Sequence, residues 1–137
     1  DASQQDNEGW TPLHFAARFG CLPVLEALRK AHMAGAGGTE GKDPLTNDDW
    51  TPLHVAARFE QKEAVSYLLG ASADKEAKDV QGRSALHVAS RHGLTQMARH
   101  FLNHHLEVDA KTSDGESTGH LALKHGHMQT LELLLNH

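Results

Sequence analysis

The sequence repeats itself. Residues 11–19 (TPLHFAARF) return almost unchanged as residues 51–59 (TPLHVAARF). A looser copy occupies residues 84–92 (SALHVASRH), and a more divergent one occupies residues 117–125 (STGHLALKH). The copies begin 40, 33 and 33 positions apart, so the basic period is 33, with seven extra residues between the first two copies. A period of this length indicates an array of small, similar structural units.

Each copy has the residue types that begin and end a short helix. A Thr or Ser hydroxyl at its first position can accept hydrogen bonds from free backbone N–H groups, and Pro12 and Pro52 suit the first helical residue. Glycine six residues after the motif histidine can adopt the left-handed conformation that ends a helix. That position holds Gly20, Glu60, Gly93 and Gly126.

A second helix is predicted after each of these turns, because apolar residues recur there at helical spacing. These apolar residues are Val24, Leu25 and Leu28; Val65, Leu68 and Leu69; Met97, Phe101 and Leu102; and Leu131, Leu134 and Leu135. Polar stretches such as residues 73–79 and 108–114 connect the copies and are typical of turns or hairpins. Since so short a helix pair cannot bury its apolar face alone, neighbouring units must stack.

The motif, the glycine after it, the leucine-rich second helix and the 33-residue period together resemble the ankyrin repeat. The resemblance implies an all-α ankyrin-repeat solenoid: stacked helix-turn-helix units joined by β-hairpin-like loops, in a single domain over residues 1–137. We expect four units, at about residues 6–45, 46–78, 79–111 and 112–137. The fourth departs from the motif at Thr118 and Gly119, which weakens its first helix and suits a terminal unit or a chain cut from a longer array.

The extra residues fall in a glycine-rich insert at about residues 31–45. We expect a loop there, because its glycines oppose regular structure. The loop either reaches a partner or is a tolerated surface insertion, which costs little free energy.

Composition excludes several classes of function. The net charge of −5 over 137 residues argues against binding to nucleic acid or to anionic membranes. No apolar run is long enough for a membrane span, and the polar start is unlike a signal peptide. The single cysteine, Cys21, fits an intracellular setting, the cytoplasm first and the nucleus as an alternative. No phosphate loop, serine elbow or zinc-protease motif is present, so we expect neither an enzyme nor a cofactor.

The resemblance implies a non-enzymatic protein-protein interaction module that binds a protein or peptide through its concave face and hairpin tips. Aromatic and arginine side chains gather at the variable positions of that surface, and they are the residue types that dominate binding hot spots. The candidate partner-binding residues are Trp10, Arg18, Phe19, Trp50, Arg58, Phe59, Arg83, Arg91, His92, Lys124 and His125. Their complement is an acidic and apolar segment, bound by a monomer.

Three alternatives remain open. The two tryptophans could pack on neighbouring hairpins, and the basic residues repeated once per unit could be only a solvated face. The array could also be a structural or regulatory segment of a larger enzyme, channel or adaptor, making contacts within one polypeptide. The end of the sequence before the polar tail that closes earlier units favours such a truncation.

The twelve histidines mostly belong to the fold. The resemblance implies that each motif histidine bonds backbone near the hairpin and is buried. With the hydroxyl residues that start the helices, the structural motif residues are Thr11, His14, Thr51, His54, Ser84, His87, Ser117 and His120. His105 takes a place where ankyrin repeats have a glycine in a left-handed turn. His100 and His104 lie one helical turn apart but lack further ligands, so no metal site is expected, whereas His92 and His125 could make a partner surface pH-responsive.

Overall fold

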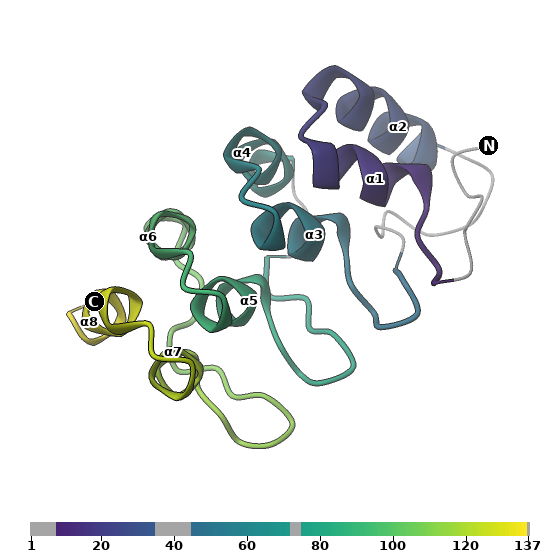
Figure 1. Ribbon diagram of the computed structural model, residues 1–137. Coiled ribbons are helices and arrows are strands. Elements are labelled where there is room, and N and C mark those ends of the chain that lie inside the picture. The colour runs from purple at the N-terminus through teal and green to yellow at the C-terminus, as the bar shows by residue number, and fades with distance from the viewer. Residues whose placement is uncertain (1–7, 35–44, 72–74, 137) are drawn as a thin grey trace. The chain divides into compact units, whose positions relative to one another are not determined.

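A computed structural model describes residues 8–34, 45–71 and 75–136. These parts of the chain contain four pairs of short helices (Figure 1). The helices are α1 (Pro12–Phe19), α2 (Leu22–Ala34), α3 (Pro52–Arg58), α4 (Lys62–Gly70), α5 (Ala85–Arg91), α6 (Thr95–Asn103), α7 (Thr118–Lys124) and α8 (Met128–Leu135). The chain divides into two compact units, residues 1–73 and 74–137, and each unit holds two helix pairs. The predicted all-α class of ankyrin-type helix pairs is confirmed.

The first helix of each pair begins with a reciprocal cap. In α1, the backbone N–H of His14 donates to Oγ1 of Thr11 over 3.4 Å, and the backbone N–H of Thr11 donates to Nδ1 of His14 over 3.1 Å. Thr51 with His54 repeats both bonds ahead of α3. Two of the unpaired N–H groups at each helix start are thereby satisfied. The predicted helix starts are confirmed, and the motif histidine is the second half of the cap.

The turns after these helices are left-handed, as the glycine pattern predicts. The backbone angle φ is positive at all four positions: Gly20 (68°), Glu60 (58°), Gly93 (69°) and Gly126 (74°). His105 also has a positive φ, 65°, so the predicted left-handed turn there is confirmed.

In the first unit, α1 packs against α3 and α2 packs against α4, as Figure 1 shows. The core between them is aliphatic: Leu13, Leu25, Val65 and Leu68 are fully buried. Arg29 of α2 is buried as well, and its Nη1 donates to the carbonyl of Ala71, 3.0 Å away at the end of α4. A cation suits that position, because the unpaired carbonyls at the end of a helix carry partial negative charge.

In the second unit, α5 packs against α7 and α6 packs against α8. Its core is built mainly from Leu86, Phe101, Leu102 and Leu121. The helix α7 forms over seven residues, like α3 and α5, although Gly119 stands where the first copy has the buried Leu13. The departure from the motif therefore removes a core side chain without abolishing the helix.

Histidines tie successive helix pairs together within each unit. Nε2 of His14 donates to the carbonyl of Trp50 over 2.9 Å, and Nε2 of His87 donates to the carbonyl of Ala110 over 2.8 Å. These bonds match the role that the resemblance implies. The expectation that every motif histidine is buried is wrong for His120, which caps α7 but is exposed because it lies on the last helix pair.

The described parts of the connections between helix pairs contain turns rather than strands. An isolated antiparallel bridge joins Lys111 to Ser117, and no strand forms in the described ranges. Within the first unit, the backbone N–H of Asn47 donates to the carbonyl of Glu8 over 3.0 Å, so the turns of successive pairs are hydrogen-bonded to each other.

Most of the glycine-rich insert, residues 35–44, lies outside the described residues, so the predicted loop stays a prediction. Of the helices that are described, none is both long and apolar enough to cross a membrane.

Candidate partner-binding surface

Two arginines and two phenylalanines meet where the first helices of the first unit end. The guanidinium carbon of Arg18 lies 5.3 Å from the ring centroid of Phe19 and 4.8 Å from that of Phe59. The guanidinium carbon of Arg58 lies 5.3 Å from the same Phe59 ring. We call these four residues, from α1 and from α3 with its C-cap, the Arg-Phe surface. The sequence predicted each residue for the interface, and the structure brings all four together.

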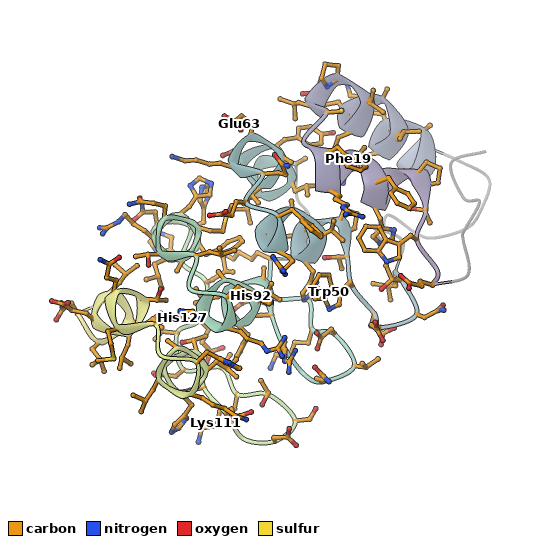
Figure 2. All side chains as sticks on the ribbon, in the orientation of Figure 1. Phe19, Trp50, Glu63, His92, Lys111 and His127 are labelled. Carbon is orange, nitrogen blue, oxygen red and sulfur yellow. The ribbon has the colours of Figure 1, made fainter. Side chains whose placement is uncertain are left out.

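The Arg-Phe surface combines exposure with order. Phe19 is 64% exposed, and Figure 2 shows its side chain at the end of α1. Phe59 and both arginines are half-buried. Each guanidinium over a ring face gains about 0.5–1 kcal/mol from the cation–π interaction at such exposed sites. The side chains are therefore already arranged before any partner arrives.

Neither guanidinium of the Arg-Phe surface makes a hydrogen bond or ion pair among the described residues. The acidic residue next to it in sequence, Glu60, is exposed in the left-handed turn. Within the described ranges, no carboxylate uses the N–H donors of Arg18 and Arg58, and both guanidiniums lie over the Phe59 ring.

The two predicted tryptophans are half-buried and make contacts inside the first unit. The ring centroid of Trp10 lies 5.2 Å from that of Phe15, and the ring of Trp50 stacks on His54 at 5.8 Å. Trp50 lies in the segment ahead of α3 (Figure 2). Packing within the protein, the alternative that the sequence left open, therefore accounts for part of each ring.

In the second unit, the corresponding residues are Arg or Lys followed by His, so histidine takes the place of phenylalanine. Arg91 and His92 at the end of α5 are half-buried, whereas Lys124 and His125 at the end of α7 are exposed. Nζ of Lys124 lies 3.5 Å from a carboxylate oxygen of Glu116. Arg83, the predicted interface residue in the turn before α5, is half-buried. Its backbone N–H donates to Oδ1 of Asp79 over 2.9 Å.

Sequence reasoning missed a contact that supports these positions. Nε2 of Gln61 donates to the carbonyl of Arg18 over 2.8 Å, and Nε2 of His127 donates to the carbonyl of Arg91 over 3.0 Å. The two donors occupy the same place in their repeats, directly before α4 and α8. The sequence does mark this position, because both donors directly follow the residue in the left-handed turn. The two residues differ in chemical type, however, so no repeated motif is visible there.

The family comparison agrees with this geometry. A family model described as ankyrin repeats (3 copies) matches residues 1–79 and residues 72–137, which together span the whole chain. The chain belongs to the ankyrin repeat family. A search of curated proteins found no match. Ankyrin repeats in general are protein-protein interaction modules and are generally non-enzymatic.

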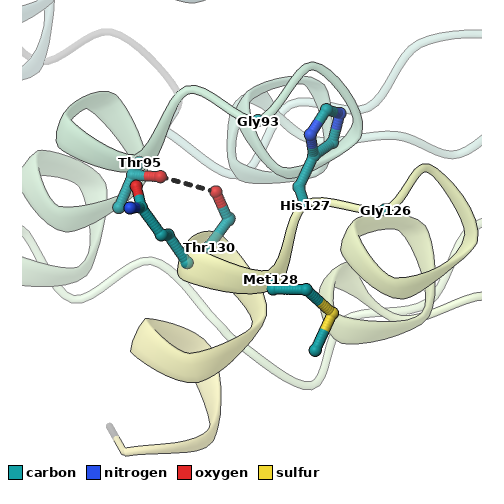
Figure 3. Close-up of a pocket in the computed structure, with 7 residues that line it drawn as sticks. Gly93, Thr95, Gly126, His127, Met128 and Thr130 are labelled. Carbon is teal, nitrogen blue, oxygen red and sulfur yellow. Dashed lines mark hydrogen bonds between the residues drawn. The ribbon is translucent and has the colours of Figure 1, made fainter.

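The ankyrin helix pairs of the second unit also form a small pocket of about 220 Å³ beside His127. Figure 3 shows Gly93, Thr95, Gly126 and Thr130 around it. The hydroxyls of Thr95 and Thr130 are 2.8 Å apart and bond each other. These two threonine hydroxyls of the pocket are therefore satisfied by each other.

The other histidines do not assemble a metal centre in the described residues. The rings of His100 and His104 meet edge to face at 4.9 Å, but no group of three or more His, Cys, Asp and Glu residues in the described ranges could hold a metal ion. Cys21 is an exposed free thiol.

Burial lowers the pKa of one motif histidine. His87 is fully buried, and desolvation holds the pKa of its imidazole below the usual 6.5. Its hydrogen bonds need the neutral ring: Nδ1 accepts from the backbone N–H of Ser84 over 3.1 Å, and Nε2 donates to Ala110. His87 is thus a structural histidine of the ankyrin repeat.

Proposed function

We propose that this ankyrin domain binds a protein or peptide partner noncovalently, and that the Arg-Phe surface is the centre of contact. The observation that carries the proposal is the Arg18 guanidinium over the rings of both Phe19 and Phe59, with the Phe19 ring largely exposed. Rigid aromatic and arginine side chains bury large areas with little loss of conformational entropy, which makes them the usual anchors of interfaces. Trp10 and Trp50 supply further apolar area at the edge.

The second unit contributes basic contacts in this proposal. Its residues at the equivalent positions contribute charge rather than apolar area to partner binding, so their loss should weaken binding less. They are Arg83, Arg91, His92, Lys124 and His125. The domain acts as a monomer without a cofactor, inside the cell and first of all in the cytoplasm, since ankyrin repeats are common in intracellular proteins.

The test compares two exposed apolar side chains. Proteins retained by the immobilised chain are identified, purified, and titrated against the wild type, Phe19→Ala and Met128→Ala. Met128 on α8 is 61% exposed and lies outside the Arg-Phe surface, so it is a matched control for surface truncation. Phe19→Ala should weaken binding at least tenfold, since hot-spot truncations exceed about 1–2 kcal/mol. Equal affinities for the two variants would refute the proposed centre, with circular dichroism reporting that both fold.

A second candidate function is that the domain packs against another part of the same polypeptide. Phe15 and Val24 on the first helix pair are 36% and 51% exposed. The second helix pair has Val55 and Ala64 at the same positions. Both are fully buried, and their helices α3 and α4 pack against the first pair. An apolar face that resembles a repeat-to-repeat interface is thus left uncovered in the described structure.

The melting temperatures of the 137-residue chain and of the natural gene product test this candidate. A higher melting temperature in a longer gene product, removed by Val24→Lys in that product, would support intramolecular packing. A gene product of the same length, or one in which Val24→Lys has no effect, would refute it.

A further inference from the structure

We propose that the Arg-Phe surface recognises carboxylates, and that its partner segment is an extended acidic peptide with two acidic residues at alternate positions. This inference rests on the proposed partner-binding function and names the chemistry of the partner. The two guanidiniums of Arg18 and Arg58 would bind the carboxylates.

The rings hold each guanidinium close and leave its N–H donors available. The guanidinium carbon of Arg18 lies over the rings of Phe19 and Phe59, 5.3 Å and 4.8 Å from their centroids. The N–H groups of a guanidinium lie in its plane, and they match the two oxygens of a carboxylate as a fork. The rings attract the cation through their π-electrons, whereas a carboxylate binds its N–H donors, so the two interactions can occur together.

The protein's own acids do not fill these forks in the described structure. Arg18 and Arg58 make no hydrogen bond or ion pair there, whereas the basic residue at the equivalent place in the last repeat, Lys124, lies 3.5 Å from Glu116. A half-buried cation that is stacked on rings and has no carboxylate gains from an incoming one, because its surroundings hydrate it less than open water does.

The distance between the two cations limits how far apart the acids can be. The guanidinium carbons lie 4.8 Å and 5.3 Å from the centroid of the same Phe59 ring, so they are at most about 10 Å from each other. Alternate residues of an extended strand point to the same side and are about 7 Å apart. Two acidic residues separated by one residue can therefore reach both forks. An apolar residue in the same segment could contact the exposed ring of Phe19.

Carboxylate is favoured over phosphate by the charge around the site. The chain carries a net charge of −5, which repels a doubly charged group more strongly than a singly charged one. The two guanidiniums over the Phe59 ring supply one positive charge for each of two anions. Such a site suits a singly charged carboxylate better than a doubly charged phosphate group, which needs more positive charge for its neutralisation.

The experiment uses the full 137-residue chain and defined peptides. The probe has the order leucine-glycine-glutamate-glycine-glutamate, its matched control carries glutamine in place of glutamate, and a third peptide carries phosphoserine there. Arginine Nε–Hε signals are followed by NMR at low salt, with Arg99, exposed on α6, as the internal reference. The glutamate peptide should shift the signals of Arg18 and Arg58 and bind about tenfold more tightly than the glutamine peptide, as charged hydrogen bonds allow.

Variants separate the fork from the charge. The double variant Arg18→Lys with Arg58→Lys keeps both charges but loses the planar forks, so its preference for glutamate over glutamine should fall to about twofold or less. Arg99→Lys should keep the full preference. Equal affinity for the glutamate and glutamine peptides, a shift of Arg99 as large as that of Arg18, or tighter binding of the phosphoserine peptide would each overturn the inference.

The two proposals fail separately. If Phe19→Ala abolishes binding of a purified partner while the glutamate and glutamine peptides bind alike, the Arg-Phe surface is an interface but not a carboxylate site. If the glutamate preference is present while Phe19→Ala leaves partner affinity unchanged, the carboxylate site stands and the proposed centre of the interface does not.

Discussion

Two glycines in left-handed turns, Gly93 and Gly126, allow the energetic cost of the backbone conformation to be measured apart from the cost of a steric clash. Gly93 and Gly126 have nearly the same backbone angle, φ of 69° and 74°. A Cβ added at Gly93 would overlap Nδ1 of the His127 ring, whereas a Cβ added at Gly126 would meet nothing within 4 Å. Gly93→Ala and Gly126→Ala therefore share one energetic penalty and differ in a second.

The shared penalty is that of placing alanine in the left-handed region, about 1–2 kcal/mol. In Gly93→Ala the His127 ring must also move, and its 3.0 Å hydrogen bond to the carbonyl of Arg91 is lost with it. A hydrogen bond of this kind contributes about 0.5–1.5 kcal/mol. We expect Gly126→Ala to lower the free energy of unfolding by about 1–2 kcal/mol and Gly93→Ala by about 0.5–1.5 kcal/mol more.

The free energies come from urea denaturation followed by far-ultraviolet circular dichroism. A double-mutant cycle with His127→Ala completes the test, because in that background the ring is gone and Gly93→Ala should cost no more than Gly126→Ala. Equal losses for the two glycine variants in the wild-type background would refute the reasoning. So would an excess loss for Gly93→Ala that persists without the His127 ring.

Two further predictions concern the second unit. Because the folded protein lowers the pKa of His87, the unfolded chain binds the extra proton first, and stability should fall as the pH drops below about 6.5 towards the folded pKa. An NMR titration of the His87 ring with a midpoint at or above 6.5 would contradict this, and urea denaturation on either side of that pH measures the loss. Gly119→Ala should raise the free energy of unfolding by about 0.5–1 kcal/mol, since its Cβ would lie in ordinary contact with Leu131, 3.7 Å away. An unchanged or lower urea midpoint for Gly119→Ala would show that the first turn of α7 gains nothing from a side chain there.

The helix pairs could be predicted because their signals are local. A Thr or Ser hydroxyl, a proline and a left-handed turn residue act within a few positions, so the starts at Thr11 and Thr51 and the turns at Gly20 and Glu60 follow from neighbouring residues. The periodicity of apolar residues then assigns the buried side of each second helix, as Leu25 illustrates.

The candidate surface was predictable only in part, because its geometry depends on contacts between repeats. Sequence columns indicated Arg18 and Phe59 as surface residues, but no local pattern shows that the cation of one repeat lies over the ring of the next. The supporting bonds were harder still. Gln61 and His127 make the same contact with different chemical groups, so comparison of the repeats by residue type does not align them as equivalents.

The hydrogen bond from Gln61 to the carbonyl of Arg18 has a consequence for the kinetics of association. It holds the backbone of the residue whose guanidinium already contacts two rings. A partner then meets a surface that needs no rearrangement, so association should proceed in one step at a rate set by diffusion and charge. Partners of different affinity would accordingly differ mainly in their dissociation rates. Gln61→Ala should first lower the association rate and make the association kinetics deviate from a single exponential.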